Sequence, residues 1–137
     1  MAAVDIARYP VHLGLGALAE IEPAFTGSMS WYEDYAQRHA VDGAEGRLVT
    51  AHRFDAPWTM WEMHPCGDEV VLCIDGTIVV HQEQPDGSTA SLTLERGQYV
   101  INPRGVWHTA DADGPATALF ITAGMGTEHR PRQRLSA

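Results

Sequence analysis

The sequence contains no lysine, and all of its 9 basic residues are arginines. A Schiff-base enzyme and a Walker-type phosphate loop both need a lysine, so these two classes of enzyme are excluded. No run of the sequence approaches the ~20 consecutive apolar residues that a transmembrane helix needs. Residues 1–10 have no basic patch followed by an apolar run, so we expect neither a signal peptide nor a membrane partner.

Cysteine is scarce, and acidic residues outnumber basic ones. The two cysteines, Cys66 and Cys73, are too few for a disulfide framework, and their spacing is not that of a common zinc site. A reducing, cytoplasmic location is therefore expected. The 18 acidic and 9 basic residues leave a net charge of −9. This charge argues against nucleic acid or an anionic membrane as a partner, and we expect neither.

The N-terminal third differs in composition from the rest of the chain. With 137 residues the chain has the size of one domain with its own hydrophobic core. We expect residues 1–46 to form an extension whose single helix, over residues 30–39, packs on the main body. Ser30 is the expected N-cap, because Glu33 follows three residues later and would complete a capping box.

From residue 47 onward, short apolar runs alternate with turn signals such as Asp75-Gly76. This rhythm predicts seven or eight strands in a β-sandwich or small barrel, and no helix-length segments separate them as a parallel α/β fold requires. We expect residues 125–137 to form a loosely packed, arginine-rich tail. The expected strands cover residues 47–54, 58–64, 69–74, 77–84, 88–94, 97–102, 106–110 and 117–123.

Ionisable residues lie on one face of two of these strands. Alternate side chains of a strand share a face, so Glu62 and His64 point the same way. If the next strand is adjacent, Glu69 converges on them. Such groups are costly to bury unless they are paired or bound to a metal, and imidazole and carboxylate are good ligands for divalent first-row metals. A hydrogen-bonded Glu62–His64 pair, or a strand at the rim, would explain the same pattern.

Two spaced patterns surround these residues. From Glu62 to Gly76 the order is Glu-x-His, four residues, Glu, six residues, Gly. From Gly97 to His108 it is Gly, five residues, Pro-x-Gly, two residues, His. Together they resemble the two motifs of the cupin superfamily, as found in small single-domain cupins. The resemblance spans residues 56–112. It implies an all-β fold, the double-stranded β-helix or jelly-roll barrel, over residues 47–124 with a short N-terminal helical segment.

The resemblance also implies a metal centre. His64, Glu69 and His108 fall on positions that bind metal in the family, whereas Glu62 stands where a first histidine is expected. Ala56 and Ala112 replace the Gly and Asn that open and close the two motifs. If Glu62 ligates, two imidazoles and two carboxylates would hold a divalent Fe, Mn or Zn ion, a harder set than three histidines and one glutamate. Otherwise Glu62 marks the loss of the metal.

The resemblance is compatible with more than one function. A metal-dependent oxygenase, isomerase or lyase acting on a small molecule is the first hypothesis, with Glu62 or Glu69 as the acid–base group when not coordinated. A metal-free, non-catalytic barrel that binds a small molecule is the alternative. The resemblance further implies a homodimer. Structural roles are expected for the other polar and aromatic candidates: His52, His81, Cys73, Arg104, Trp58, Trp61 and Trp107.

Overall fold

The computed structural model describes residues 1–133; residues 134–137, which include Arg134, lie outside the described part. The described part comprises eleven strands, one α-helix and two short 3-10 helices, Leu15–Ala17 and Ala40–Glu45. The helix is α1 (Met29–Arg38). The strands are β1 (Val11–Gly14), β2 (Leu18–Ile21), β3 (Arg47–Phe54), β4 (Met60–Met63), β5 (Glu69–Asp75), β6 (Ile78–Glu83), β7 (Thr89–Leu94), β8 (Tyr99–Asn102), β9 (His108–Ala112), β10 (Ala116–Thr122) and β11 (Glu128–Pro131).

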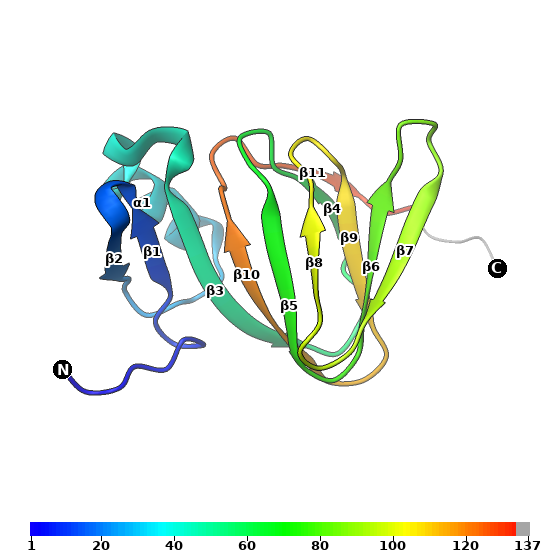
Figure 1. The fold of residues 1–137 in the computed structure, drawn as a ribbon, viewed down its shortest axis with the longest axis horizontal. Coiled ribbons are helices and arrows are strands. Elements are labelled where there is room, and N and C mark those ends of the chain that lie inside the picture. Colours follow the sequence, from blue (N-terminus) through cyan, green and yellow to red (C-terminus); the bar gives the residue numbers. More distant parts are fainter. Residues whose placement is uncertain (134–137) are drawn as a thin grey trace.

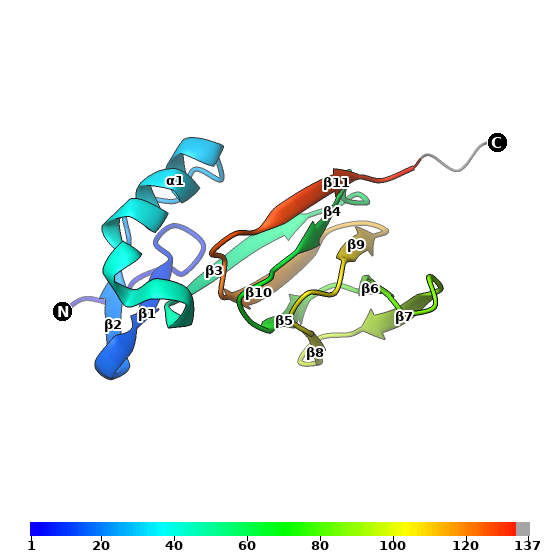
Figure 2. The same cartoon turned by 90° about the horizontal axis from the view of Figure 1, so that it is seen from above.

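The strands form two antiparallel sheets that lie one over the other (Figures 1 and 2). The six-stranded sheet has the order β2-β1-β3-β10-β5-β8, and the five-stranded sheet has the order β11-β4-β9-β6-β7. Of the eight strands from β3 to β10, four lie side by side in the six-stranded sheet (β3, β10, β5 and β8) and four in the five-stranded sheet (β4, β9, β6 and β7). Eight antiparallel strands divided between two sheets in this way make a jelly roll. The predicted all-β jelly roll with a short N-terminal helix is therefore confirmed.

The hydrophobic core lies between the two sheets. Val71, Ile78, Val80 and Phe120 are buried there, together with alanines such as Ala118, whose small side chains let the sheets approach closely. Cys73 is fully buried in the same cluster. It therefore has the expected role of a small apolar core residue.

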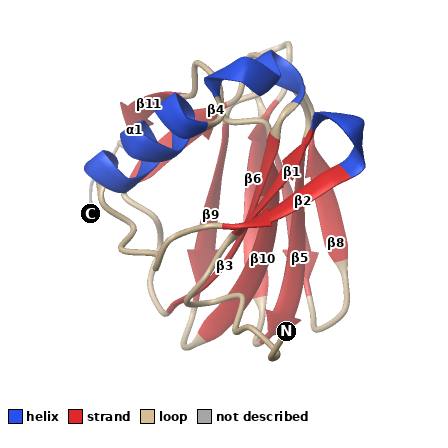
Figure 3. Cartoon of the chain, turned by 90° about the vertical axis from the view of Figure 1, so that its left-hand side faces the viewer, coloured by secondary structure: helices blue, strands red, loops and turns tan. Residues whose placement is uncertain are grey.

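Helix α1 lies at the same end of the molecule as β1 and β2 (Figures 1 and 2), and Figure 3 views the molecule from that end. Its N-cap is Ser28, whose hydroxyl accepts a hydrogen bond from the backbone N–H of Trp31, so the expectation of Ser30 as N-cap was wrong. Ser30 lies inside the first turn, where its hydroxyl contacts that of Ser28 at 2.9 Å. With Ser28 as cap, Trp31 occupies the third position and Glu33 completes no capping box. In residues 1–133, no helix is long and apolar enough to cross a membrane.

Within the predicted tail, residues 128–131 are more ordered than their composition indicates. The tail was expected to be loosely packed, but β11 pairs with β4 over four residues. The Arg130 guanidinium lies 4.5 Å from the ring centre of Trp107 and 5.3 Å from that of Trp61, and it pairs with Glu83. These tertiary contacts override a local composition typical of loops. They also account for the two tryptophans.

The N-terminal segment contributes to the sheet as well as covering it. Strand β1 pairs with both β2 and β3, so residues before the predicted boundary at residue 46 belong to the six-stranded sheet. The backbone pairing therefore continues from β2 through β1 and β3 to β10. Strand β1 alternates apolar and polar residues only over Val11, His12 and Leu13, and β2 shows no such alternation, so the pattern by which the later strands were predicted is too short here. The boundaries of the three predicted segments remain predictions.

Candidate metal centre

Four side chains from three strands and one strand end converge between the sheets. Glu62 lies on β4, His64 directly follows β4, Glu69 opens β5, and His108 opens β9. Each offers one ligand atom, and these atoms all lie within 4.8 Å of one another. His64, Glu69 and His108 are buried, and the Glu62 side chain is 28% exposed. The structure therefore brings together all four residues that the sequence analysis singled out.

The donor atoms have spacings that suit a single ion. His64 Nε2 lies 3.2 Å from one oxygen of Glu69, and His108 Nε2 lies 3.1 Å from the other. Glu62 Oε2 lies 3.8 Å from His64 Nε2 and 3.7 Å from His108 Nε2. Ligands at about 2.0–2.2 Å from one ion stand roughly 3–3.6 Å apart. The cluster is close to this range, with Glu62 slightly outside it.

Both histidine Nε2 atoms are buried and have no hydrogen-bond partner among the described residues. They lie near carboxylate oxygens, but the geometry is not that of a hydrogen bond. Buried polar atoms in folded proteins are nearly always satisfied, because an unsatisfied one keeps its full desolvation cost. A cation between the imidazoles and the carboxylates would satisfy both nitrogen atoms. The donor set of this structure therefore fits a divalent metal ion.

Glu69 is held firmly in its position. Asn102 Nδ2 donates to one carboxylate oxygen at 3.1 Å, and the Thr122 hydroxyl donates to the other at 2.7 Å. Gln82 Nε2 donates in turn to Asn102 Oδ1 at 2.9 Å, which orients the Asn102 amide. Burial raises the pKa of Glu69, but the facing imidazoles of His108 and His64 outweigh burial and hold this pKa well below its usual range. Glu69 is an oriented, ionised carboxylate.

The two carboxylates make the cluster attractive to positive charge. Burial raises the pKa of Glu62, but its contacts with His108 and His129 prevail and lower it to about 2. Burial lowers the pKa of His108, but the facing carboxylates of Glu62 and Glu69 prevail and raise it to about 9. A proton and a metal ion would therefore compete for His108 Nε2, because the same two carboxylates stabilise either positive charge.

The sequence analysis missed two residues of this site, both supplied by the C-terminal segment. The Thr127 hydroxyl lies 2.8 Å from His64 Nδ1. His129 Nε2 lies 3.2 Å from Glu62 Oε1, because His129 is paired with Glu62 in the β11–β4 ladder. No alternating pattern marks residues 128–131 as a strand. The signal that the sequence did offer was a hydroxyl side chain, Thr127, and an imidazole side chain, His129, within an arginine-rich tail.

The other candidates have partners elsewhere. His81 bonds to Ser91 and Asp111, each at 2.7 Å, on the five-stranded sheet. Arg104 is exposed and donates to the backbone carbonyl of Cys66 at 3.1 Å. The ring of His52 packs 4.7 Å from that of Phe120, where burial lowers the pKa of His52.

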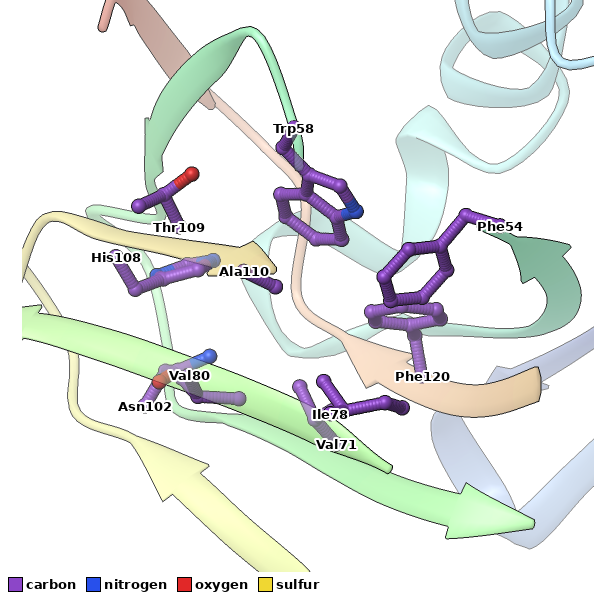
Figure 4. A pocket seen from close by; sticks show the side chains of 10 residues that line it. All are labelled: Phe54, Trp58, Val71, Ile78, Val80, Asn102, His108, Thr109, Ala110 and Phe120. Atoms are coloured by element: carbon purple, nitrogen blue, oxygen red, sulfur yellow. The ribbon is translucent and has the colours of Figure 1, made fainter. Parts of the chain in front are cut away.

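A small pocket extends from His108 into the core (Figure 4). His108 and Asn102 lie near one end of it, and the aromatic rings of Phe54, Trp58 and Phe120 lie at the other. Val71, Ile78 and Val80 also line the pocket. Its walls are therefore mainly apolar, with an imidazole and an amide at one end.

The site and the fold together define a jelly roll with a His/Glu cluster whose spacing is close to that of a metal site. No protein-family model and no curated protein matches the chain. The chain is similar in fold to a cupin-2 domain protein from Shewanella frigidimarina, at 21% identity over 63% of this chain and 71% of that one, with a TM-score of 0.48. It is also similar to hydroquinone 1,2-dioxygenase from Sphingomonas, solved with 4-hydroxybenzoate, at 22% identity over 56% and 59% of the chains, with a TM-score of 0.48. A cupin superfamily protein from Desulfitobacterium hafniense is 18% identical over 56% and 65% of the chains, with a TM-score of 0.47.

Proposed function

We propose that Glu62, His64, Glu69 and His108 bind one divalent first-row metal ion and that the protein acts there on a small molecule. One observation carries this proposal. Two buried Nε2 atoms without hydrogen-bond partners among residues 1–133 lie 3.1–3.2 Å from the two oxygens of one oriented carboxylate. Two carboxylates balance the charge of a divalent ion, and two carboxylates with two imidazoles favour Fe, Mn or Zn over Cu.

The metal would act as a Lewis acid toward an oxygen atom of the bound small molecule. Both oxygens of Glu69 already accept hydrogen bonds, so this residue holds its place and its charge. Glu62 is 28% exposed, and His129, whose imidazole contacts its carboxylate, is 39% exposed. Glu62 is therefore the better candidate to take or give a proton when it is not coordinated. Oxygenase, isomerase and lyase reactions are the classes proposed.

A metal-free binding barrel is the second candidate function. The observation that favours it is the pKa of His108, which the facing carboxylates raise to about 9 against the effect of burial. A protonated His108 would balance one of the two carboxylates without any metal. In that case the apolar pocket beside His108, whose volume is about 10 Å³, would have to open before it could bind a small molecule without turnover.

The partner we propose, besides a small molecule, is a second copy of the chain. One face of the six-stranded sheet carries an unbroken row of aliphatic side chains in cross-strand register, with the outermost two about half exposed. Because the chain carries a net charge of −9, two copies approach most easily at an uncharged face. The row consists of Ile101, Val70, Ile121, Val49, Val11 and Ile21.

The metal proposal is tested by elemental analysis of the untagged protein, beside His108→Ala and the matched control His81→Ala. His81 is a histidine of the same sheet that bonds outside the cluster. We expect about one Fe, Mn or Zn ion per chain in the wild type and in the control, and a loss of at least tenfold in His108→Ala. Absence of metal from the wild type after reconstitution with all three ions would overturn the proposal and favour the metal-free barrel.

A further inference from the structure

Thr127 lies in the turn between β10 and β11, directly before the paired residue Glu128. Because Glu128 pairs with Met63, Thr127 lies opposite His64, and its hydroxyl is 2.8 Å from His64 Nδ1. We propose that Thr127 is a positioning residue that keeps His64 in the tautomer whose Nε2 carries a lone pair into the cluster. The effect of Thr127 on metal affinity rests on the proposed function, whereas the tautomer of His64 is a property of the metal-free protein.

The direction of the hydrogen bond follows from the second contact of Thr127. Its Oγ1 donates to the backbone carbonyl of Gly124 at 2.8 Å, and a carbonyl can only accept. A hydroxyl has one proton, so Oγ1 must accept from His64 Nδ1–H. A neutral imidazole has one N–H, which leaves His64 Nε2 unprotonated. This nitrogen is one of the two buried atoms without a hydrogen-bond partner in the described part of the chain.

The turn that carries Thr127 is built against the loop that carries His64. The backbone N–H of Thr127 also donates to Gly124, at 3.2 Å, and Gly126 has a φ of +74°, a conformation that glycine adopts without strain. A Cβ atom at Gly126 would lie 3.2 Å from Cγ of Pro65, the residue after His64. Close packing at this point fixes the position of the hydroxyl relative to the imidazole.

His108 provides an internal comparison. Its Nδ1 faces the backbone carbonyl of Val106 at 3.4 Å, and this acceptor favours a proton on Nδ1. Backbone of the same segment therefore orients His108, and no side chain has to be present. His64 depends on a hydroxyl 63 residues away in the sequence. A single substitution in the C-terminal segment can therefore change the tautomer of one ligand and leave the other unchanged.

The experiment compares Thr127→Val, which keeps the shape but removes the hydroxyl, with Thr127→Ser, which keeps the hydroxyl. Thr93→Val on β7 is the matched control. Long-range proton–nitrogen NMR spectra of the metal-free chain report the tautomer of each histidine. Competition with a chromophoric chelator gives the dissociation constants for Zn²⁺ and Mn²⁺. Thermal unfolding checks that each variant is folded.

We expect His64 to carry its proton on Nδ1 in the wild type, in Thr127→Ser and in Thr93→Val. In Thr127→Val we expect a mixture of tautomers at His64, an unchanged His108, and metal binding weakened about 10- to 100-fold. A wild-type His64 protonated on Nε2, or a Thr127→Val variant with an unchanged tautomer, would overturn the inference. Failure of the wild type to bind either ion would instead overturn the proposed function, because the tautomer is measured without metal. An unfolded Thr127→Val leaves Thr127→Ser and the wild-type tautomer to decide.

Discussion

Glu62 and His108 face each other in the register pair that joins β4 to β9, with Glu62 Oε2 3.7 Å from His108 Nε2. The residue that departs from the first cupin-like motif therefore lies beside the histidine of the second. The side chain at position 62 also contacts His129 from β11. Position 62 thus decides whether the cluster carries one carboxylate or two, and with it the hardness of the donor set.

Replacement of Glu62 by histidine is expected to change which metal ion binds more tightly, and to change the overall affinity for metal less. Glu62→His replaces a carboxylate by an imidazole and leaves Glu69 as the one anionic donor. We expect the ratio of Zn²⁺ to Mn²⁺ affinity to rise by roughly tenfold, because nitrogen donors suit Zn²⁺ better than Mn²⁺. Competition titrations of both ions measure the ratio. Glu128→His, on the exposed neighbouring strand, is the control, and an equal ratio in both variants would contradict the prediction.

Removal of the Asn102 amide is expected to destabilise the metal-free protein. Asn102→Leu takes away the hydrogen bond to the buried Glu69 and leaves the Gln82 amide with the backbone carbonyl of Ile101 as its remaining acceptor. The free energy of unfolding should fall by about 1–3 kcal/mol, the cost of an unsatisfied buried group. Urea unfolding measures it. Gln82→Leu is the graded control, because Gln82 contacts Glu69 only through Asn102; a larger loss there than in Asn102→Leu would refute the network.

Asp111 is expected to make stability fall in acid. Burial raises the pKa of Asp111, but hydrogen bonds from Arg132 and His81 outweigh burial and lower it. A carboxyl with a lower pKa in the folded state stabilises the fold above its unfolded pKa of about 4 and loses that contribution as pH falls further. Asp111→Asn should therefore be less stable than wild type at pH 7, and the difference should shrink below about pH 4. Urea unfolding at a series of pH values measures it, and a difference constant across pH would exclude this role.

The proposed dimer makes a prediction about the aliphatic row of the six-stranded sheet. Ile101 is 48% exposed at one end of the row and pairs with Val70. Ile101→Lys places a charge in the apolar face and should weaken the dimer at least tenfold, because a buried unpaired charge is costly. Sedimentation equilibrium measures association. Leu92→Lys, at an apolar residue of β7 in the other sheet that is 37% exposed, is the control. A monomeric wild type would refute the dimer itself.

The strand rhythm predicted a β-sandwich or small barrel, and the resemblance to the two cupin motifs implied the jelly roll and the four clustered residues. Alternation put Glu62 and His64 on one face, and Glu69 was expected to converge on them if the next strand were adjacent; β4 and β5 instead belong to different sheets. The resemblance of the segment from Gly97 to His108 to the second cupin motif supplied the fourth residue. The structure brings all four ligand atoms within 4.8 Å of one another. Strand ends were less accurate. The strand expected over residues 58–64 is shorter, because Trp58 and His64 lie outside the paired part of β4.

The sequence by itself determined the strand rhythm, the acidic surface and the chemistry of the clustered residues, because these depend on neighbours within a few positions. Only the tertiary structure decided the role of the C-terminal segment. Thr127 contacts His64 and His129 contacts Glu62, each across more than 60 residues of sequence. The β11–β4 pairing brings them together, and residues 128–131 show no apolar alternation that would have predicted this strand. From its sequence neighbours, Arg130 would be predicted to be a solvated charge. In the structure its guanidinium packs against the rings of Trp61 and Trp107. Contacts of this kind depend on the closure of the whole fold.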